Sequence, residues 1–379
     1  MRRLLAAAFC MFAATPLPAQ ERVPRTAETI EVSIVNVDVV VTDRKGNPVR
    51  GLTKDDFEVR EGGKPRAITN FTEYSPEARE GGDAAVAPPE KRTIVVFIEA
   101  FGLPRFSIDP MFDALRDAMK KIVRPGDAAA IYTWAGGATL LRAGFTDDVD
   151  TLDAKLEEIA EESVGVAANE FASAAREIAF EHAFYDSVAT AGPMGPAAAA
   201  RGRAAAEESR AMEDVELYKI RRKAEALQSL MRAIAGAEGK KIVISATNRF
   251  GVHAAADRFP DGTVPFHKRA DFDTRRFREA VARTANAYGI TVYPIYPAGL
   301  QWTPRADASQ VRPDDTALAR DNNILMNETS SLQELAAATG GVMAWGAKDA
   351  ASLMPRIVED LQSYYSLAYR ATGATAGAI

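Results

Sequence analysis

A carboxylate at the end of an apolar run is the first residue in this chain that could do chemistry. Residues 93–103 read TIVVFIEAFGL, and the apolar residues from Ile94 to Ile98 run unbroken up to Glu99. A short apolar run rich in β-branched residues indicates a strand buried on both faces, as in a parallel sheet. Open α/β sheets bind ligands beyond the carboxyl ends of such strands. Glu99 is therefore the first candidate for a functional carboxylate.

The histidines offer little further chemistry. His182, His253 and His267 are scattered, and no two of them have the spacing of a metal-binding pair. The sequence has no Ser in a nucleophile elbow, no P-loop and no dinucleotide fingerprint. We therefore expect no catalytic residues and no enzymatic activity. A hydrolase that uses the loop 248–270, which contains His253 and His267, is the alternative.

The composition is that of an ordinary globular protein of 379 residues, with 47% hydrophobic and 26% charged residues. This length fits one large α/β domain with an attachment. The net charge is −6, and an acidic balance without a basic cluster argues against nucleic acid as a partner. The basic residues at 221–223 are interpreted as one solvated helix face.

The first nineteen residues read as a signal peptide. Arg2 and Arg3 precede the apolar segment Leu4–Ala14, which is too short to span a bilayer, and cleavage is expected after Ala19. The single cysteine, Cys10, lies inside this segment, so disulfides are not expected in the mature chain. An uncleaved anchor is the alternative. The sequence thus predicts a secreted or periplasmic protein with no membrane span in the mature chain.

Changes in composition divide the chain into segments. Residues 76–91 are rich in Glu, Gly, Ala and Pro, as linkers are. The predicted organisation is a signal peptide at 1–19, a leader at 20–29, a small β-domain at 30–75, a linker at 76–91, an α/β domain at 92–370 with a helical portion at about 163–236, and a disordered tail at 371–379.

The α/β domain alternates predicted strands and helices. Strands are expected at 93–98, 128–134, 138–145, 240–247, 290–296, 342–345 and 364–370. Gly136-Gly137 predicts a tight hairpin, which makes one edge strand antiparallel. Ser331–Glu334 has the pattern of a capping box that opens a helix ending near Thr339. The predicted fold class is a doubly wound, mostly parallel sheet with one antiparallel edge strand, plus the small N-terminal β-domain.

Seven local motifs occur in an order that resembles one known family. They are VNVDVVVTD at 35–43, GLTKDDFEVRE at 51–61, RPGD at 124–127, GKKIVIS at 239–245, YGITVYPIYPAGL at 288–300, LQELAAATGG at 332–341 and EDLQSYYSLAY at 359–369. On these motifs the chain resembles the bacterial von Willebrand factor A-related domain family. The resemblance implies a Rossmann-like sheet flanked by helices, with a short N-terminal β-domain.

Domains of the wider von Willebrand A class often carry a metal-ion-dependent adhesion site, whose core is D-x-S-x-S after the first strand. Against that pattern, Glu99 stands at the first Asp, Phe101 and Leu103 stand at the two Ser positions, and Ala246 stands at a later Asp. A small hard cation needs about six oxygen ligands. We therefore expect no metal and no cofactor. The alternative is Mg²⁺ or Ca²⁺ held by Glu99, Ser107 and Asp109.

The resemblance and the missing catalytic residues together predict a non-catalytic interaction module that binds an unidentified protein partner. The binding surface is expected in the loops at the carboxyl end of the sheet, because long loops on a rigid sheet tend to carry function. Aromatic and Arg side chains there are typical interface anchors. The predicted contact residues are Glu99, Phe101, Arg105, Phe106, Arg249, Phe250 and Trp302. A metal-dependent adhesion domain and a structural envelope component are further alternatives.

Overall fold

The structure is a computed structural model of the whole chain. It describes residues 34–44, 47–75, 91–99, 105–135, 138–164, 196–247, 250–254, 256, 263–264, 266, 269–297, 315–345, 355 and 357–371. The predicted signal peptide, the leader, most of the linker and most of the tail lie outside these residues, as does the first part of the predicted helical portion.

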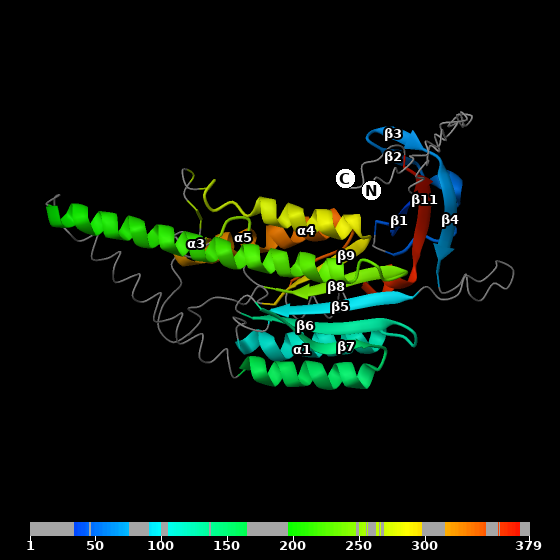
Figure 1. Cartoon of the computed structure of the whole chain (residues 1–379), viewed down its shortest axis with the longest axis horizontal. Coiled ribbons are helices and arrows are strands. Elements are labelled where there is room, and N and C mark those ends of the chain that lie inside the picture. Colours follow the sequence, from blue (N-terminus) through cyan, green and yellow to red (C-terminus); the bar gives the residue numbers. More distant parts are fainter. Residues whose placement is uncertain are drawn as a thin grey trace, which may run out of the picture.

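A six-stranded sheet forms the centre of the molecule (Figure 1). Its strand order is β10-β9-β8-β5-β6-β7, and every neighbouring pair is parallel except β6 and β7. The predicted antiparallel edge strand is therefore confirmed. The strands span Arg92–Glu99 (β5), Ala128–Ala135 (β6), Ala138–Thr146 (β7), Lys240–Ala246 (β8), Ile290–Tyr296 (β9) and Ala344–Trp345 (β10).

Helices cover both faces of the sheet, as the doubly wound fold requires (Figure 1). One face carries α3 (Pro196–Ala233), α4 (Arg275–Ala287) and α5 (Asp315–Thr339). The other face carries α1 (Arg105–Ile122) and a helical segment at 149–164. Every residue of β5 is buried, and alternate side chains enter the two hydrophobic clusters on either side of the sheet. This explains the continuous apolar run in the sequence, since a central parallel strand has no solvent face.

The RPGD motif closes the amino-terminal edge of the sheet. Asp127 accepts hydrogen bonds from Nε of Arg92 at 2.9 Å and from the backbone N–H of Arg124 at 2.8 Å. Gly126 has a φ of 91°, which few other residues adopt, so the tight turn needs glycine there. The motif thus joins the start of β5 to the start of β6.

A smaller antiparallel sheet lies beside the amino-terminal edge of the large one (Figure 1). Its strand order is β1-β11-β4, with β1 at Ile34–Val39, β4 at Ile68–Tyr74 and β11 at Tyr364–Arg370. The segment between β1 and β4 contains η1 (Lys54–Asp56) and a hairpin of β2 (Val59–Glu61) and β3 (Lys64–Arg66).

The position of β11 corrects the sequence-based organisation. The strand at 364–370 was expected within the α/β domain, but it is the middle strand of the small sheet. The physical reason is that β1 and β4 alone would bury too little apolar surface. Tyr365 supplies that surface by packing on Phe57 and Phe71, with ring centroids 5.1 and 5.7 Å away.

The expected capping box at Ser331–Glu334 is also wrong. Helix α5 begins at Asp315 and runs through this segment without a break. Ser331 is fully buried in the middle of the helix, and its hydroxyl donates to the backbone carbonyl of Phe250. The sequence pattern was misleading because a Ser that bonds to a neighbouring segment resembles one that caps a helix. The predicted end of the helix at Gly340-Gly341 is confirmed, since Gly340 has a φ of 78°.

No helix in the described ranges is both long and apolar enough to cross a bilayer.

Candidate functional site

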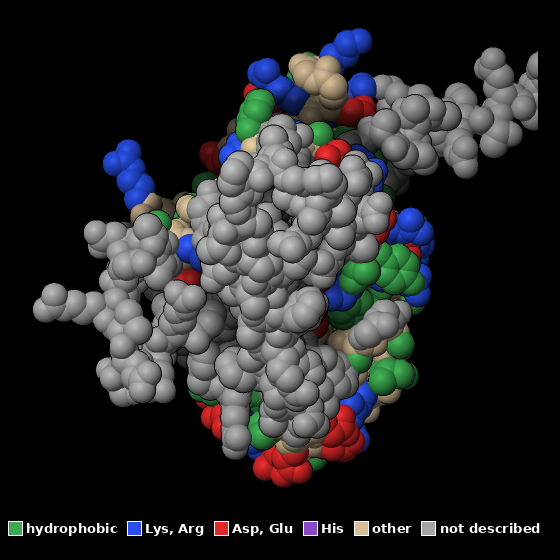
Figure 2. Space-filling model, turned by 90° about the vertical axis from the view of Figure 1, so that its left-hand side faces the viewer, with side chains coloured by type: hydrophobic (Ala, Val, Ile, Leu, Met, Phe, Trp, Pro, Cys, Tyr) green, Lys and Arg blue, Asp and Glu red, His purple; other side chains and the backbone are tan. Residues whose placement is uncertain are grey.

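The candidate site lies at the carboxyl edge of the large sheet, where β5, β6, β8 and β9 all end (Figure 1). Helix α3 extends past this edge. Figure 2 views the molecule from this side and shows acidic side chains at the lower rim, where the helical segment 149–164 lies. Its exposed acids include Glu157, Glu158, Glu161 and Glu162.

Glu99 ends the central strand and forms a buried ion pair with Lys223 of α3. The Nζ atom of Lys223 lies 2.6 Å from Oε2 of Glu99, and the two side chains are 2% and 10% exposed. Two charges can be buried together only when each neutralises the other, because an isolated buried charge costs several kcal/mol. The carboxylate at this edge is therefore engaged by a cation that the chain itself supplies.

The position of Lys223 follows from the pattern of α3. Ile220, Ala224 and Leu227 form its buried stripe at helical spacing, and Lys223 falls on the same face. This placement corrects the interpretation of residues 221–223 as one solvated face, because only Arg221 and Arg222 are substantially exposed. The signal for Lys223 was present in the sequence as a lysine inside an apolar stripe.

Trp134, near the end of β6, contacts the ion pair of Glu99 and Lys223. It is the cross-strand partner of Glu99, and the Lys223 ammonium lies 5.3 Å from the centroid of its indole ring. A cation held over an indole face gains favourable electrostatic energy. The indole Nε1 is buried and has no hydrogen-bond partner within the described chain. We refer to Glu99, Lys223 and Trp134 as the edge cluster.

The residues that the structure describes at this edge offer a divalent cation few ligands. Glu99 is held by Lys223, and Ala246, at the position of the later Asp in the adhesion pattern, has a side chain without ligand atoms and is fully buried. Asp109 is exposed on α1, and the side chain of Ser107 lies outside the described set. In the described part of the chain, no three His, Cys, Asp or Glu side chains form a group that could hold a metal ion. A hard cation would have to displace the ammonium to reach Glu99.

Two of the predicted contact residues are buried. Phe250 is 2% exposed and packs in the hydrophobic cluster beneath α3, α4 and α5, so we correct its assignment as a surface anchor. Glu99 is likewise turned inward to Lys223. Both were predicted from residue type and position in a loop or at a strand end, which do not reveal burial.

The other predicted contacts stay predictions. Arg105 and Phe106 begin α1, but their side chains are outside the described residues. Phe101, Arg249 and Trp302 lie entirely outside them.

The segment that contains Phe250 and His253 is hydrogen-bonded to α5. The backbone N–H of His253 donates to Oδ1 of Asn327 at 2.9 Å, and that of Phe250 donates to Oε2 of Glu328 at 2.8 Å. Burial, aided by the charge of Arg269, lowers the pKa of His253. His267, the other histidine of the predicted hydrolytic loop, lies outside the described residues.

Comparisons with known proteins found similar solved structures, all at low sequence identity. No family model and no curated protein matches the chain. Among solved structures, an aerotolerance-related membrane protein from Bacteroides fragilis NCTC 9343 is similar at 13% identity and a TM-score of 0.35, over 72% of this chain and 98% of that chain. The vWF domain of the type V pili tip protein Mfa5 from Porphyromonas gingivalis is similar at 10% identity and a TM-score of 0.36, over 72% and 95%. The TFIIH p34 N-terminal domain is similar at 12% identity and a TM-score of 0.23, over 71% and 96%.

At these TM-scores the similarities carry no argument about fold or function. The fold follows from the strand order itself: a central β5, parallel neighbours on both sides, one antiparallel edge strand and helices on both faces. This is a von Willebrand A-like, Rossmann-like arrangement, and the fold expected from the sequence is confirmed.

Proposed function

We propose that this chain is a secreted or periplasmic interaction module of von Willebrand A type. It binds a protein partner through the loops at the carboxyl edge of the sheet, and it does so without catalysis and without a divalent cation. The observation that carries the proposal is the buried pair of Glu99 and Lys223. An adhesion site of this type would use the strand-end carboxylate to hold its metal, and here that carboxylate pairs with an ammonium.

The edge cluster makes the proposed surface independent of metal. In a metal-dependent site the cation fixes the loops and offers its open position to a partner carboxylate. Here Lys223 neutralises the strand-end carboxylate and joins α3 to β5 without a metal ion. The residues that contact the partner are then the remaining predicted anchors, Phe101, Arg105, Phe106, Arg249 and Trp302.

The acidic rim supports a protein partner over a nucleic acid. Exposed glutamates at 157–162 lie at this edge, and they would repel a phosphate backbone. Secretion rests on the sequence of residues 1–19 alone.

Calorimetric titration of the full chain with Mg²⁺, Mn²⁺ and Ca²⁺ tests the first part of the proposal. We expect neither heat of binding nor a change in melting temperature. Saturable binding that Glu99→Gln abolishes would overturn the metal-independent reading in favour of the adhesion alternative.

Affinity capture from the envelope fraction tests the second part. We expect the captured partner to be retained in EDTA and lost with the double variant Arg249→Ala/Trp302→Ala. The matched control is Arg283→Ala, an exposed arginine on α4 away from the proposed loops. Equal capture by the double variant and the wild type would sink the assignment of these loops as the binding surface.

A further inference from the structure

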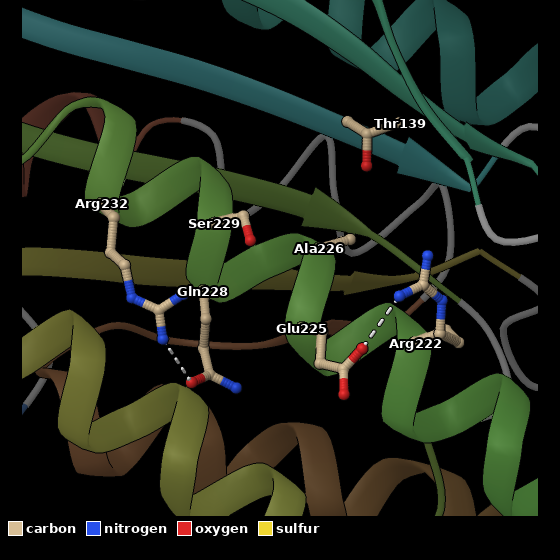
Figure 3. A pocket seen from close by; sticks show the side chains of 7 residues that line it. All are labelled: Thr139, Arg222, Glu225, Ala226, Gln228, Ser229 and Arg232. Carbon is tan, nitrogen blue, oxygen red and sulfur yellow. Dashed lines mark hydrogen bonds and ion pairs between the residues drawn. The ribbon is translucent and has the colours of Figure 1, made fainter.

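A groove with a volume of about 430 Å³ lies along α3 and is closed on one side by Thr139 of β7 (Figure 3). Its charged side chains are engaged within α3. Arg222 binds Glu225 at 3.0 Å, and Arg232 donates to the neutral amide of Gln228 at 3.2 Å. The groove therefore gives no reason to expect a ligand, and the more informative feature lies at the other end of the molecule.

The small sheet lies at the amino-terminal edge of the large sheet, away from the proposed binding edge (Figure 1). Its outer strands, β1 and β4, come from residues 34–75, which we call the N-terminal segment. Its middle strand, β11, comes from residues 364–370. Among the described strands, β1 and β4 pair only with β11. The N-terminal segment is thus assembled on a strand from the far end of the chain.

Strand β11 contacts the large sheet through its first residue, Tyr364. Lys240, the first residue of β8, is 4% exposed. Its Nζ atom lies 3.9 Å from the centroid of the Tyr364 ring and donates to the backbone carbonyl of Asp360 at 2.9 Å. An ammonium held over an aromatic ring and away from water is attracted more strongly than one at the surface. Lys240 therefore holds the start of β11 against the start of β8.

The helical residues 357–362 place β11 in the same position. Ile357 and Leu361 are buried in the hydrophobic cluster on the α1 side of the large sheet. The backbone N–H of Ser363 donates to the carbonyl of Glu359 at 2.8 Å, so the helical turn reaches the residue directly before β11. None of these contacts involves β1 or β4, so the large sheet alone can position β11.

The N-terminal segment, in contrast, depends on β11. Tyr74 stacks on Tyr364 with ring centroids 4.7 Å apart, and the hydroxyl of Thr69 donates to the carbonyl of Ala368 at 3.0 Å. Without β11 the segment keeps two strands that have no partner and little core, which is too little for a stable sheet. The large sheet keeps all of its strand pairs when the segment leaves. The dependence therefore runs in one direction.

We propose that β11 is a template held by the large sheet, and that the N-terminal segment opens from it and closes onto it as one unit. In the open state β11 loses its strand partners, but Lys240 keeps Tyr364 in place. The large sheet and its carboxyl edge stay folded. Openings of this kind need less free energy than global unfolding. The device is independent of the function proposed above, because it changes the far end of the molecule.

Hydrogen exchange of the full chain, followed by mass spectrometry in urea below the unfolding transition, tests the proposal. We expect the protected amides of residues 34–75 and 364–370 to exchange together, at least about tenfold faster than those of residues 92–99. Residues 357–363 should exchange as slowly as residues 92–99, because they stay on the large sheet. Equal rates for residues 34–75 and 92–99 would overturn the proposal. So would exchange of residues 357–363 in step with residues 34–75, since β11 would then leave together with the N-terminal segment.

Tyr74→Leu weakens the contact with β11 from the side of the N-terminal segment. We expect residues 34–75 to exchange about three- to tenfold faster in this variant, while residues 92–99 keep the wild-type rate. Unchanged exchange of residues 34–75, or the same acceleration in residues 92–99, would contradict a separate opening unit. This variant leaves Lys240 intact, so it decides the question even where a change at Lys240 prevents folding.

Lys240→Met tests the hold of the large sheet on β11. We expect residues 357–363 to lose their slow exchange and to open together with residues 34–75. Lys241→Met is the matched control, because the neighbouring ammonium donates to the Ala237 carbonyl at 3.1 Å and not to β11. It should keep the wild-type ratio of the two rates. The same ratio in both lysine variants would show that Lys240 does not hold the template.

Discussion

Lys223 Nζ lies 2.6 Å from Glu99 Oε2, and this contact joins a helix to a strand 124 residues earlier in the chain. It fastens α3 to the carboxyl end of β5 at the one place where the sheet carries a buried carboxylate. Neither residue is free to change alone. Removal of one partner takes from the other its countercharge in this buried pair, which is far more costly than loss of the attraction itself.

Lys223→Met should therefore destabilise the protein by about 3–5 kcal/mol in urea unfolding. The double variant Glu99→Gln/Lys223→Met should be less destabilised than Lys223→Met alone, because no charge is left unpaired. Arg221→Met is the matched control. Its ion pair with Glu225 is exposed, so its loss should cost at most about 1 kcal/mol. A double variant as unstable as the sum of its two single changes would contradict the coupling.

Asp153 and Arg116 give a pH-dependent contribution on the opposite face of the sheet. The hydrogen bond from Arg116, at 2.8 Å, lowers the pKa of Asp153 to about 2. A carboxyl whose pKa is lower in the folded than in the unfolded state stabilises the fold above about pH 4, and this contribution is lost as the pH falls toward about 2.

Asp153→Asn should thus lower the free energy of unfolding by roughly 1 kcal/mol near pH 7, and the difference from the wild type should vanish as the pH falls from about 4 to about 2. Urea midpoints measured across this range test the expectation. Asp214→Asn, an exposed residue on α3, serves as the control and should follow the wild type throughout. A difference that stays constant with pH would show that the ion pair is not its cause.

The fold was largely predictable from the sequence, and the site was less so. The continuous apolar run before Glu99 and the Gly136-Gly137 hairpin predicted the central strand and the antiparallel edge, since both signals are local. Strand β11 was misplaced because pairing over some 300 residues leaves no local signal. The role of Lys223 was missed for a similar reason: a lysine in an apolar stripe shows that something is buried with it, but not which carboxylate.

Gly341 lies so close to the backbone of β9 that no side chain fits there, a constraint that the motif at 332–341 did not reveal. A Cβ at this position would lie 2.0 Å from the carbonyl oxygen of Val292 in β9, which is backbone and cannot rotate away. Gly341→Ala should therefore destabilise the protein by roughly 1–3 kcal/mol. Gly236→Ala is the control, since a Cβ there meets nothing within 4 Å and its φ is not positive. Similar unfolding midpoints for the two variants would rule out the close approach of Gly341 to β9.

Because β11 is the middle strand of the small sheet, removal of the C-terminal residues should unfold that sheet. Deletion of residues 364–379 removes the middle strand, so β1 and β4 lose their pairing partner. The hydroxyl of Tyr365, which donates to the Val49 carbonyl at 2.9 Å and accepts from the Leu52 N–H at 3.1 Å, is lost with it. We expect amide protection in residues 34–75 to disappear and proteases to cleave there, because an isolated pair of strands has little core.

Deletion of residues 372–379 alone is the matched control for this truncation, because it leaves every residue of β11 in place. Protection in residues 34–75 should then equal that of the full chain. The α/β sheet should keep its protection in both truncated proteins, since β5 and its neighbours are paired without β11. If residues 34–75 stay protected after the longer deletion, the small sheet does not depend on its C-terminal strand, and the register of Val35 with Tyr369 has no energetic role.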